Sequence, residues 1–169
     1  EKIKETISDG SSAAKALDVA EYINKHLPKD ATVMKLQKLA YYSQVESLVH
    51  YNKKLFSEKI EAWAAGPVIK EIYEVHKGLM HPGNIKFGNA SNLSLEQKTC
   101  IGWAMEKYGK LDGDTLSHLT HIEDPWKIVR KGLPRNARSH AEITDELIIN
   151  YYSALPDYSL LDDEATSLS

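Results

Sequence analysis

The feature that most constrains the fold is a long helical segment that is apolar around most of its circumference. Thr32 can cap a helix over residues 33–51, because a threonine hydroxyl accepts a hydrogen bond from one of the first N–H groups. Its apolar residues are Met34, Leu36, Leu39, Ala40, Tyr41, Tyr42, Val45, Leu48 and Val49. A helix that is apolar on more than one side must be packed by neighbours on several sides. We therefore predict a compact, mainly α-helical single domain around this central buried helix.

Two further segments, residues 62–73 and 116–131, each place a tryptophan close to a proline that can begin a helix. Proline fits the first helical position because its missing N–H is not needed there. The aromatic ring beside it can anchor the start of the helix in the core. We interpret both segments as scaffold, with Trp63, Gly66 and Pro67 in the first and Asp124, Pro125 and Trp126 in the second.

The remaining helices are predicted from their caps and their apolar spacing. They cover residues 13–26 after Ser12, residues 95–108 with a capping box of Ser94 and Gln97, residues 114–120, and residues 145–153 after Thr144. Residues 55–65 partly alternate between apolar and polar, which indicates a short extended segment that residues 85–87 could join. The predicted fold is thus mainly α, with a small two- or three-stranded β element.

The composition is that of an ordinary globular protein. The chain has 169 residues, which suits one domain, and its net charge of -3 is too small to indicate a nucleic-acid or membrane partner. It has neither an apolar run long enough for a membrane span nor a signal peptide at its start, so we expect a cytoplasmic protein. The single cysteine, Cys100, lies in a helical pattern and is expected to be a buried, inert thiol.

The charges are distributed unevenly toward the end of the chain. Residues 127–138 hold five basic residues and no acid, whereas residues 139–169 hold seven acids and no Lys or Arg. The ordinary interpretation of the basic segment is a solvated face. The next is a surface that binds an acidic patch on a protein partner. Binding to nucleic acid comes last, because no aromatic residues alternate with the basic ones. The acidic tail, residues 156–169, is expected to be solvated, with docking on a partner or on the basic segment as the alternative.

Few residues indicate catalytic chemistry. His118 and His121 can share a helix face, and His76 could join them, so a metal-dependent hydrolase is one alternative. The ordinary interpretation of His121 is a polar helix end that hydrogen-bonds a neighbouring carbonyl. The sequence contains no HExxH motif, no GxSxG elbow, no phosphate-binding GxxxxGK[ST] loop and no GxGxxG fingerprint. We therefore predict a protein that is not an enzyme and needs no cofactor or metal.

Four motifs in order resemble a known family, the Panacea or SocA-like antitoxin domain. The resemblance covers residues 13–155, leaving an N-terminal extension of residues 1–12 and the acidic tail outside it. The motifs are KLQKLAYYSQ at 35–44, KIEAWAAGPVIKEIY at 59–73, LSHLTHIEDPW at 116–126 and ITDELIINYY at 143–152.

The resemblance implies an antitoxin of a type II-like toxin–antitoxin pair from bacteria or phages, which neutralises its cognate protein toxin by direct binding. An alternative is an adaptor that delivers the toxin to a Clp-type AAA+ protease, with the acidic tail as the tether. The shared motif residues, Trp63, Gly66, Pro67, His121, Pro125 and Trp126, are then expected to be scaffold. We expect the toxin to contact exposed residues of the basic segment and of the loop at 82–92, and the candidates in the basic segment are Lys127, Arg130, Lys131 and Arg135.

Overall fold

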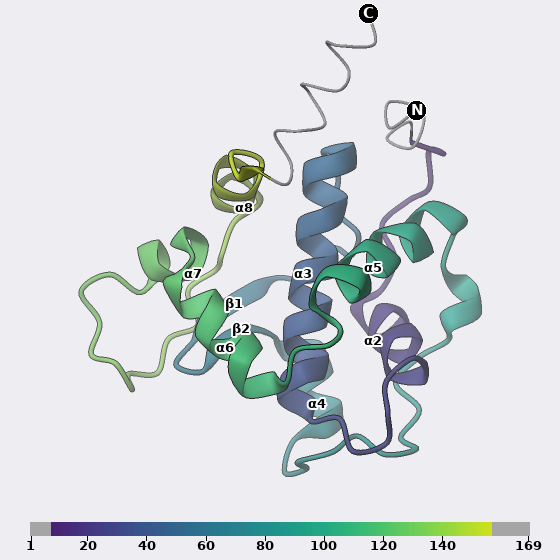
Figure 1. Cartoon of the computed structure of the whole chain (residues 1–169), viewed down its shortest axis with the longest axis horizontal. Helices are drawn as coiled ribbons and strands as arrows, with labels where there is room; N and C mark the ends of the chain where they lie inside the picture. The colour runs from purple at the N-terminus through teal and green to yellow at the C-terminus, as the bar shows by residue number, and fades with distance from the viewer. Residues whose placement is uncertain (1–7, 157–169) are drawn as a thin grey trace, which may run out of the picture.

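The computed structural model describes residues 8–156 and is mainly α-helical, with one small two-stranded antiparallel sheet (Figure 1). Within these residues, no helix is long and apolar enough to cross a membrane. The elements in chain order are α2 (Ala16–Lys25), α3 (Val33–Tyr51), β1 (Ile60–Trp63), β2 (Gly66–Ile69), α4 (Lys70–His76), the 3₁₀ turn η1 (Ala90–Asn92), α5 (Leu95–Tyr108), α6 (Gly113–Ile122), α7 (Asp124–Val129) and α8 (Asp145–Tyr152).

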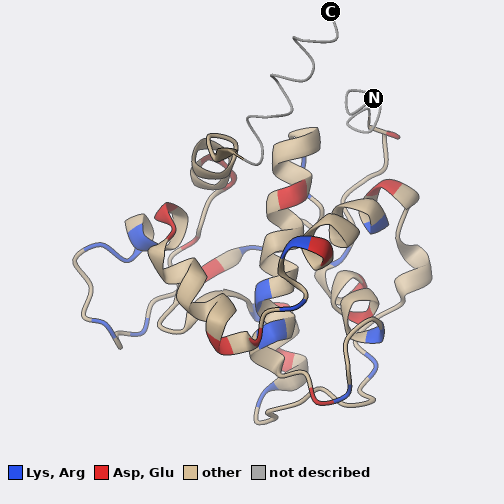
Figure 2. Cartoon of the chain, viewed as in Figure 1, with Lys and Arg blue, Asp and Glu red and all other residues tan. Residues whose placement is uncertain are grey.

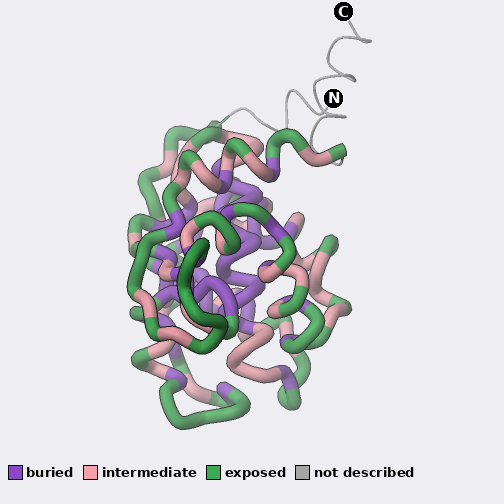
Figure 3. The backbone as a smooth tube through the Cα atoms, turned by 90° about the vertical axis from the view of Figure 1, so that its left-hand side faces the viewer, coloured by how far each residue is buried: buried purple, intermediate pink, exposed green. Residues whose placement is uncertain are grey.

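Helix α3 is the centre of the domain, as the sequence predicts. It runs through the middle of the molecule and contacts α2, α4, α5, α6, α8 and β2 (Figure 1). Every residue from Leu36 to Leu48 is buried, on all sides of the helix. Turned by a right angle, the backbone shows buried segments in the interior and exposed ones on the outer loops (Figure 3).

Buried polar side chains of α3 hold the backbone of the segments around it. Gln37 Oε1 accepts a hydrogen bond from Ile69 N at 2.9 Å, and its Nε2 donates to Ile69 O at 3.1 Å. Gln44 Oε1 accepts from Leu55 N and Phe56 N, and its Nε2 donates to Phe56 O at 2.9 Å. Each amide thus satisfies buried backbone groups that no helix or strand ladder could reach.

The first tryptophan–proline segment differs from its prediction, because Gly66 and Pro67 begin a strand and not a helix. Strand β2 pairs with β1, with Trp63 opposite Gly66 and Ala62 opposite Pro67. Ala62 N donates to Ala141 O, on the side of β1 away from β2. Ala62 and Pro67 are therefore a pair that exchanges no backbone hydrogen bonds, so the missing N–H of Pro67 costs the ladder nothing. Helix α4 starts only at Lys70.

Gly66 is favoured by its backbone conformation and by the close approach of Lys38 on α3. Its φ of 121° is a conformation that side chains rarely adopt, and a Cβ there would lie 2.6 Å from Lys38 Cε. Lys38 is 1% exposed, and its ammonium donates to Pro67 O at 3.1 Å. Burial lowers the pKa of Lys38 to about 7.

The extended segment beside β1 is not the predicted one. Residues 85–87 form no strand, and Phe87 N instead donates to the buried carboxylate of Glu21. The chain that runs along β1 comes from much later in the sequence: Ile143 N donates to Ile60 O at 2.8 Å, next to the bond between Ala62 and Ala141. The sheet element therefore joins the hairpin to the segment before α8.

The helix caps agree with the sequence in three cases and differ in two. Thr32, Ser94 and Thr144 cap α3, α5 and α8, and Ser94 forms the predicted capping box with Gln97. Helix α2 begins at Ala16, after an N-cap at Lys15 and not at Ser12, since Ala14 N donates to Leu55 O instead. Helix α7 has Glu123 in place of Asp124 as its N-cap residue, with Pro125 in the first turn.

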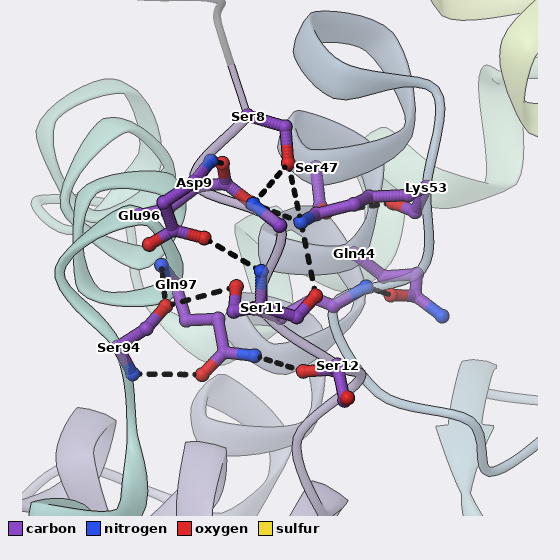
Figure 4. Close-up of polar contacts among 12 residues, drawn as sticks. Ser8, Asp9, Ser11, Ser12, Gln44, Ser47, Lys53, Ser94, Glu96 and Gln97 are labelled. Carbon is purple, nitrogen blue, oxygen red and sulfur yellow. Dashed lines mark hydrogen bonds and ion pairs between the residues drawn. The ribbon is translucent and has the colours of Figure 1, made fainter.

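The first described residues lie against α5 and the turn after α3 (Figure 4). Asp9 N donates to Glu96 Oε1 at 2.6 Å, and Lys53 pairs with Glu96 Oε2 at 2.6 Å. Lys53 also donates to Ser11 O, and Gln97 Nε2 donates to Ser12 O at 2.6 Å. Part of the predicted N-terminal extension, residues 8–12, is thus fastened to the helical domain.

Glu123 joins three helices through buried tyrosines. Its Oε1 accepts hydrogen bonds from the hydroxyls of Tyr42 on α3 and Tyr152 on α8, at 2.6 and 2.7 Å. Tyr41 lies 3.0 Å from Tyr152, and it is the donor because the Tyr152 proton is already given to Glu123. Burial raises the pKa of Glu123, and the two hydroxyl donors oppose this shift.

Cys100 is buried in the core, as predicted. Burial raises the pKa of its thiol to about 12, so little thiolate forms near neutral pH. The structure therefore confirms that Cys100 is a buried core residue.

Removal of the Tyr152 hydroxyl should destabilise the domain. We expect Tyr152→Phe to lower the free energy of unfolding by about 1–3 kcal/mol, because Glu123 loses a buried donor and Tyr41 loses its acceptor. Tyr151→Phe is the control, since no hydrogen bond of its hydroxyl is observed among the described residues, and it should change stability by less than about 0.5 kcal/mol. Equal effects in urea denaturation would contradict this role of Tyr152.

Lys38 should make stability depend on pH. Because its pKa is about 7 in the folded chain and 10.5 as a free side chain, folding releases a proton, and stability is lost as the pH falls from 10.5 toward 7. We expect the free energy of unfolding to rise by about 2 kcal/mol from pH 7 to pH 9. Lys38→Met should abolish this rise, whereas Lys110→Met, at an exposed position, should keep it. An unchanged rise in Lys38→Met would show that Lys38 is not its source.

Candidate functional site

The basic segment forms an exposed surface on α7 and on the loop that follows it. Lys127, Lys131, Arg135 and Arg138 are all exposed. Figure 2 shows the loop after α7 marked by basic residues and by no acidic one. A surface with one sign of charge attracts and orients a partner of the opposite sign.

Apolar side chains are exposed among these cations. Ile128 on α7 is 51% exposed, and Leu133 in the loop is 41% exposed. Large apolar residues that remain exposed beside charges of one sign are typical of a protein-binding surface. We call the set of Lys127, Ile128, Lys131, Leu133, Arg135 and Arg138 the basic face.

Arg130 does not belong to this face, although the sequence placed it among the exposed candidates. It is 6% exposed, and its guanidinium donates to the carbonyls of Ala62 on β1 and Ala137 in the loop, both at 2.9 Å. It also donates to Pro134 O and Arg135 O, and it lies over the ring of Trp126. The planar group with five donors thus fixes the loop to the hairpin, a task that a surface charge could not perform.

A groove lies next to the basic face, between the hairpin turn, α4 and the end of the loop. Its volume is about 470 Å³. The ring of Tyr73 packs edge-on against Trp63, with centroids 4.8 Å apart, and His140 is edge-on to the same tryptophan at 6.0 Å. The lining residues are Trp63, Ala64 and Ala65 of the turn, Lys70, Tyr73 and Glu74 of α4, and residues 136–140 of the loop.

Glu61 orders two of these groove residues. Its Oε1 accepts a hydrogen bond from Trp63 Nε1 at 2.8 Å and lies 2.8 Å from His140 Nδ1. Burial opposes ionisation of this carboxyl, but the hydrogen bonds from Trp63 and His140 outweigh it and lower the pKa of Glu61. One carboxylate oxygen therefore orients both aromatic rings.

The two tryptophan–proline segments meet behind the groove. Trp126 Nε1 donates to Trp63 O at 2.8 Å, which links α7 to the hairpin. His121 stacks on Trp126 with ring centroids 4.1 Å apart, and Pro125 is buried. Four of the expected scaffold residues, Trp63, His121, Pro125 and Trp126, thus lie in one connected region, and Gly66 and Pro67 follow on the same hairpin.

The histidines do not assemble into a metal site in the part of the chain that the structure describes. No group of three or more His, Cys, Asp or Glu side chains in residues 8–156 is arranged to hold a metal ion. His118 and His121 have ring centroids 6.5 Å apart, and His76 is buried against Gln37 on α3 at 3.0 Å. The carbonyl contact expected for His121 is not observed among these residues. Its ring stacks on Trp126, and its buried Nε2 has no hydrogen-bond partner there.

The second expected contact region, residues 82–92, is fastened to α2. Phe87 N donates to Glu21 and Asn89 N to Asp18, both at 2.8 Å. Phe87 and Ala90 are buried, so only part of this loop faces solvent. Reasoning from the sequence missed the groove residues Lys70, Tyr73 and His140, because no local signal indicates that residues 136–140 return to α4.

We expect Arg130 to control the order of the loop. Arg130→Lys should lower the free energy of unfolding by about 2 kcal/mol, because one ammonium cannot reach four carbonyls. Amides of residues 135–140 should also exchange hydrogen faster. Arg135→Lys, at an exposed position, serves as the control with neither effect. Unchanged exchange in Arg130→Lys would contradict the role of Arg130 in ordering the loop.

Comparison with known proteins identifies the family of the chain. Its residues 36–127, from the first turns of α3 to the middle of α7, match the family described as "Antitoxin SocA-like, Panacea domain". No curated protein and no solved structure shows significant similarity. The family match includes more than half of the chain, together with the hairpin, the groove residues of α4 and both tryptophans described above. The chain belongs to the SocA-like Panacea domain family of antitoxins.

Proposed function

We propose that this chain is an antitoxin that neutralises a cognate protein toxin by binding it directly, and that the basic face is its contact surface. The observation that carries the proposal is the combination of four exposed cations with exposed Ile128 and Leu133. All of this face except Lys127 lies beyond the residues that match the family, 36–127. A surface outside the common scaffold is a suitable place for contacts with one particular toxin.

The charge of the basic face defines the kind of partner surface. Residues 127–138 hold four exposed cations and no acid, so this segment favours an acidic toxin surface. Electrostatic complementarity of this kind raises the rate of association and selects the partner. The apolar side chains supply the contact area that is removed from water, as the centres of protein interfaces require.

The rigidity of the loop supports tight binding. Nanomolar affinity corresponds to about 12 kcal/mol, and ordering a flexible loop would consume part of that free energy. Here the carbonyls of Pro134, Arg135 and Ala137 are already held by Arg130. The loop therefore meets a partner in a shape that the scaffold has fixed beforehand.

Neutralisation by occupancy needs no catalytic group, cofactor or metal, since a bound toxin is blocked from its own target. The alternative is delivery of the toxin to a Clp-type AAA+ protease. It depends on the acidic tail, of which residues 157–169 lie outside the described part of the chain. Direct binding is preferred because the basic face combines exposed cations with exposed Ile128 and Leu133, which suits a protein contact.

Charge reversal on the basic face should abolish neutralisation. The triple variant Lys127→Glu, Lys131→Glu, Arg135→Glu should bind the toxin encoded by the adjacent reading frame about 100-fold more weakly than the natural chain, and it should fail to restore growth when the two are co-expressed. The control variant reverses three exposed lysines elsewhere, Lys25, Lys29 and Lys110, and should bind and rescue normally.

The outcomes distinguish an error in the proposed function from an error in the proposed contact surface. If the natural chain neither binds this toxin nor rescues growth, the proposed function is wrong. If it does both and the triple variant does so equally well, the function stands and the basic face is the wrong surface.

A further inference from the structure

We propose that the groove beside Trp63 is the anchor pocket of the interface and receives an acidic segment of the toxin that carries one large apolar or aromatic side chain. This inference rests on the proposed function and adds the chemistry of the partner. It concerns residues of the hairpin turn, α4 and the loop at 136–140, none of which belongs to the basic face apart from Arg138.

The aromatic lining suits a large apolar side chain. Tyr73 and His140 each form an edge-on contact with Trp63, and all three side chains keep part of their surface in solvent. A volume of about 470 Å³ is within the range of pockets that bind specific groups. Half-exposed Trp and Tyr at the edge of a groove are typical of sites that dominate binding energy.

The charges around the groove indicate that an acid accompanies that side chain. Lys70 on α4 and Arg138 in the loop both line it and are exposed. Neither forms a close ion pair among the described residues, although the charge of Lys70 helps to lower the pKa of Glu61, and the lining holds one acid, Glu74. A guanidinium can bind a carboxylate with two parallel hydrogen bonds, so Arg138 is suited to an Asp or Glu of the partner.

The groove is formed before any partner arrives. Glu61 Oε1 contacts both Trp63 Nε1 and His140 Nδ1, at 2.8 Å each. Arg130 holds Ala137, and Ala62 next to Trp63 accepts from the same guanidinium. An anchor side chain therefore enters a pocket whose walls lose little conformational freedom on binding.

The groove and the basic face are continuous along the chain. Leu133 and Arg135 of the face lead directly into residues 136–140, which form one wall of the groove. A partner seated on the basic face thus has the groove at its edge. This continuity favours an extension of the same protein partner over an unrelated small ligand.

The test measures binding of the purified toxin encoded by the adjacent reading frame. The double variant Lys70→Glu, Arg138→Glu should bind about 30-fold more weakly or worse, and Tyr73→Ala about 10-fold more weakly, chiefly through faster dissociation. The matched control is Lys77→Glu, Lys110→Glu, with one exposed lysine at the end of α4 and one remote from it. The control should bind within about twofold of the natural chain. Unchanged melting temperatures ensure that folding is not the cause.

A charge-swap selection identifies the partner group. Toxin variants that restore binding to Arg138→Glu should replace an Asp or Glu with Lys or Arg, next to an apolar residue. If the groove variants bind normally while reversal of Lys127, Lys131 and Arg135 abolishes binding, the anchor pocket is wrong and the proposed function stands. If the natural chain does not bind the toxin at all, both are wrong.

Discussion

The fold depends on hydrogen bonds from the buried polar side chains of α3 to the backbone of its neighbours. Gln37, Lys38 and Gln44 bind carbonyls and amides of Ile69, Pro67, Leu55 and Phe56, in segments that are too short or irregular to satisfy themselves. An unpaired backbone group in that position would cost about 1–3 kcal/mol. The central helix is therefore both the core and the template on which the hairpin is placed.

The position of the hairpin then determines the position of the candidate surface. The carbonyls of Ala62 and Trp63 accept hydrogen bonds from Arg130 and Trp126, so α7 and its loop are attached to strand β1. Glu61 on the same strand orders His140 at the far end of the loop. Helix α3 thus positions strand β1, and β1 positions the basic face and the groove through the hydrogen bonds that Ala62, Trp63 and Glu61 make to α7 and its loop.

The sequence predicts those parts of the structure that local chemistry decides. The capping box of Ser94 and Gln97 lies within α5, and the all-round apolar pattern lies within α3. Both features are local, and both are confirmed. Pro67 was misassigned because a proline after glycine is typical of a helix start, whereas here it pairs with Ala62 at a strand position where the ladder needs no N–H. Arg130 was taken for a surface charge because one carbonyl that it binds belongs to the distant Ala62, and because no local signal indicates that the loop folds back so that Ala137 reaches it. The groove could not be predicted for the same reason.

The most direct test of the account is hydrogen exchange of the chain, measured alone and in complex with the toxin from the adjacent reading frame. The central claim is that a rigid scaffold presents the partner with the basic face and the groove. Bound toxin should slow exchange at residues 70–75 and 127–141 and leave α2 and α5 unchanged. Protection confined to α2, α5 or the loop at 82–92 would contradict the claim, because the partner would then occupy the other side of α3.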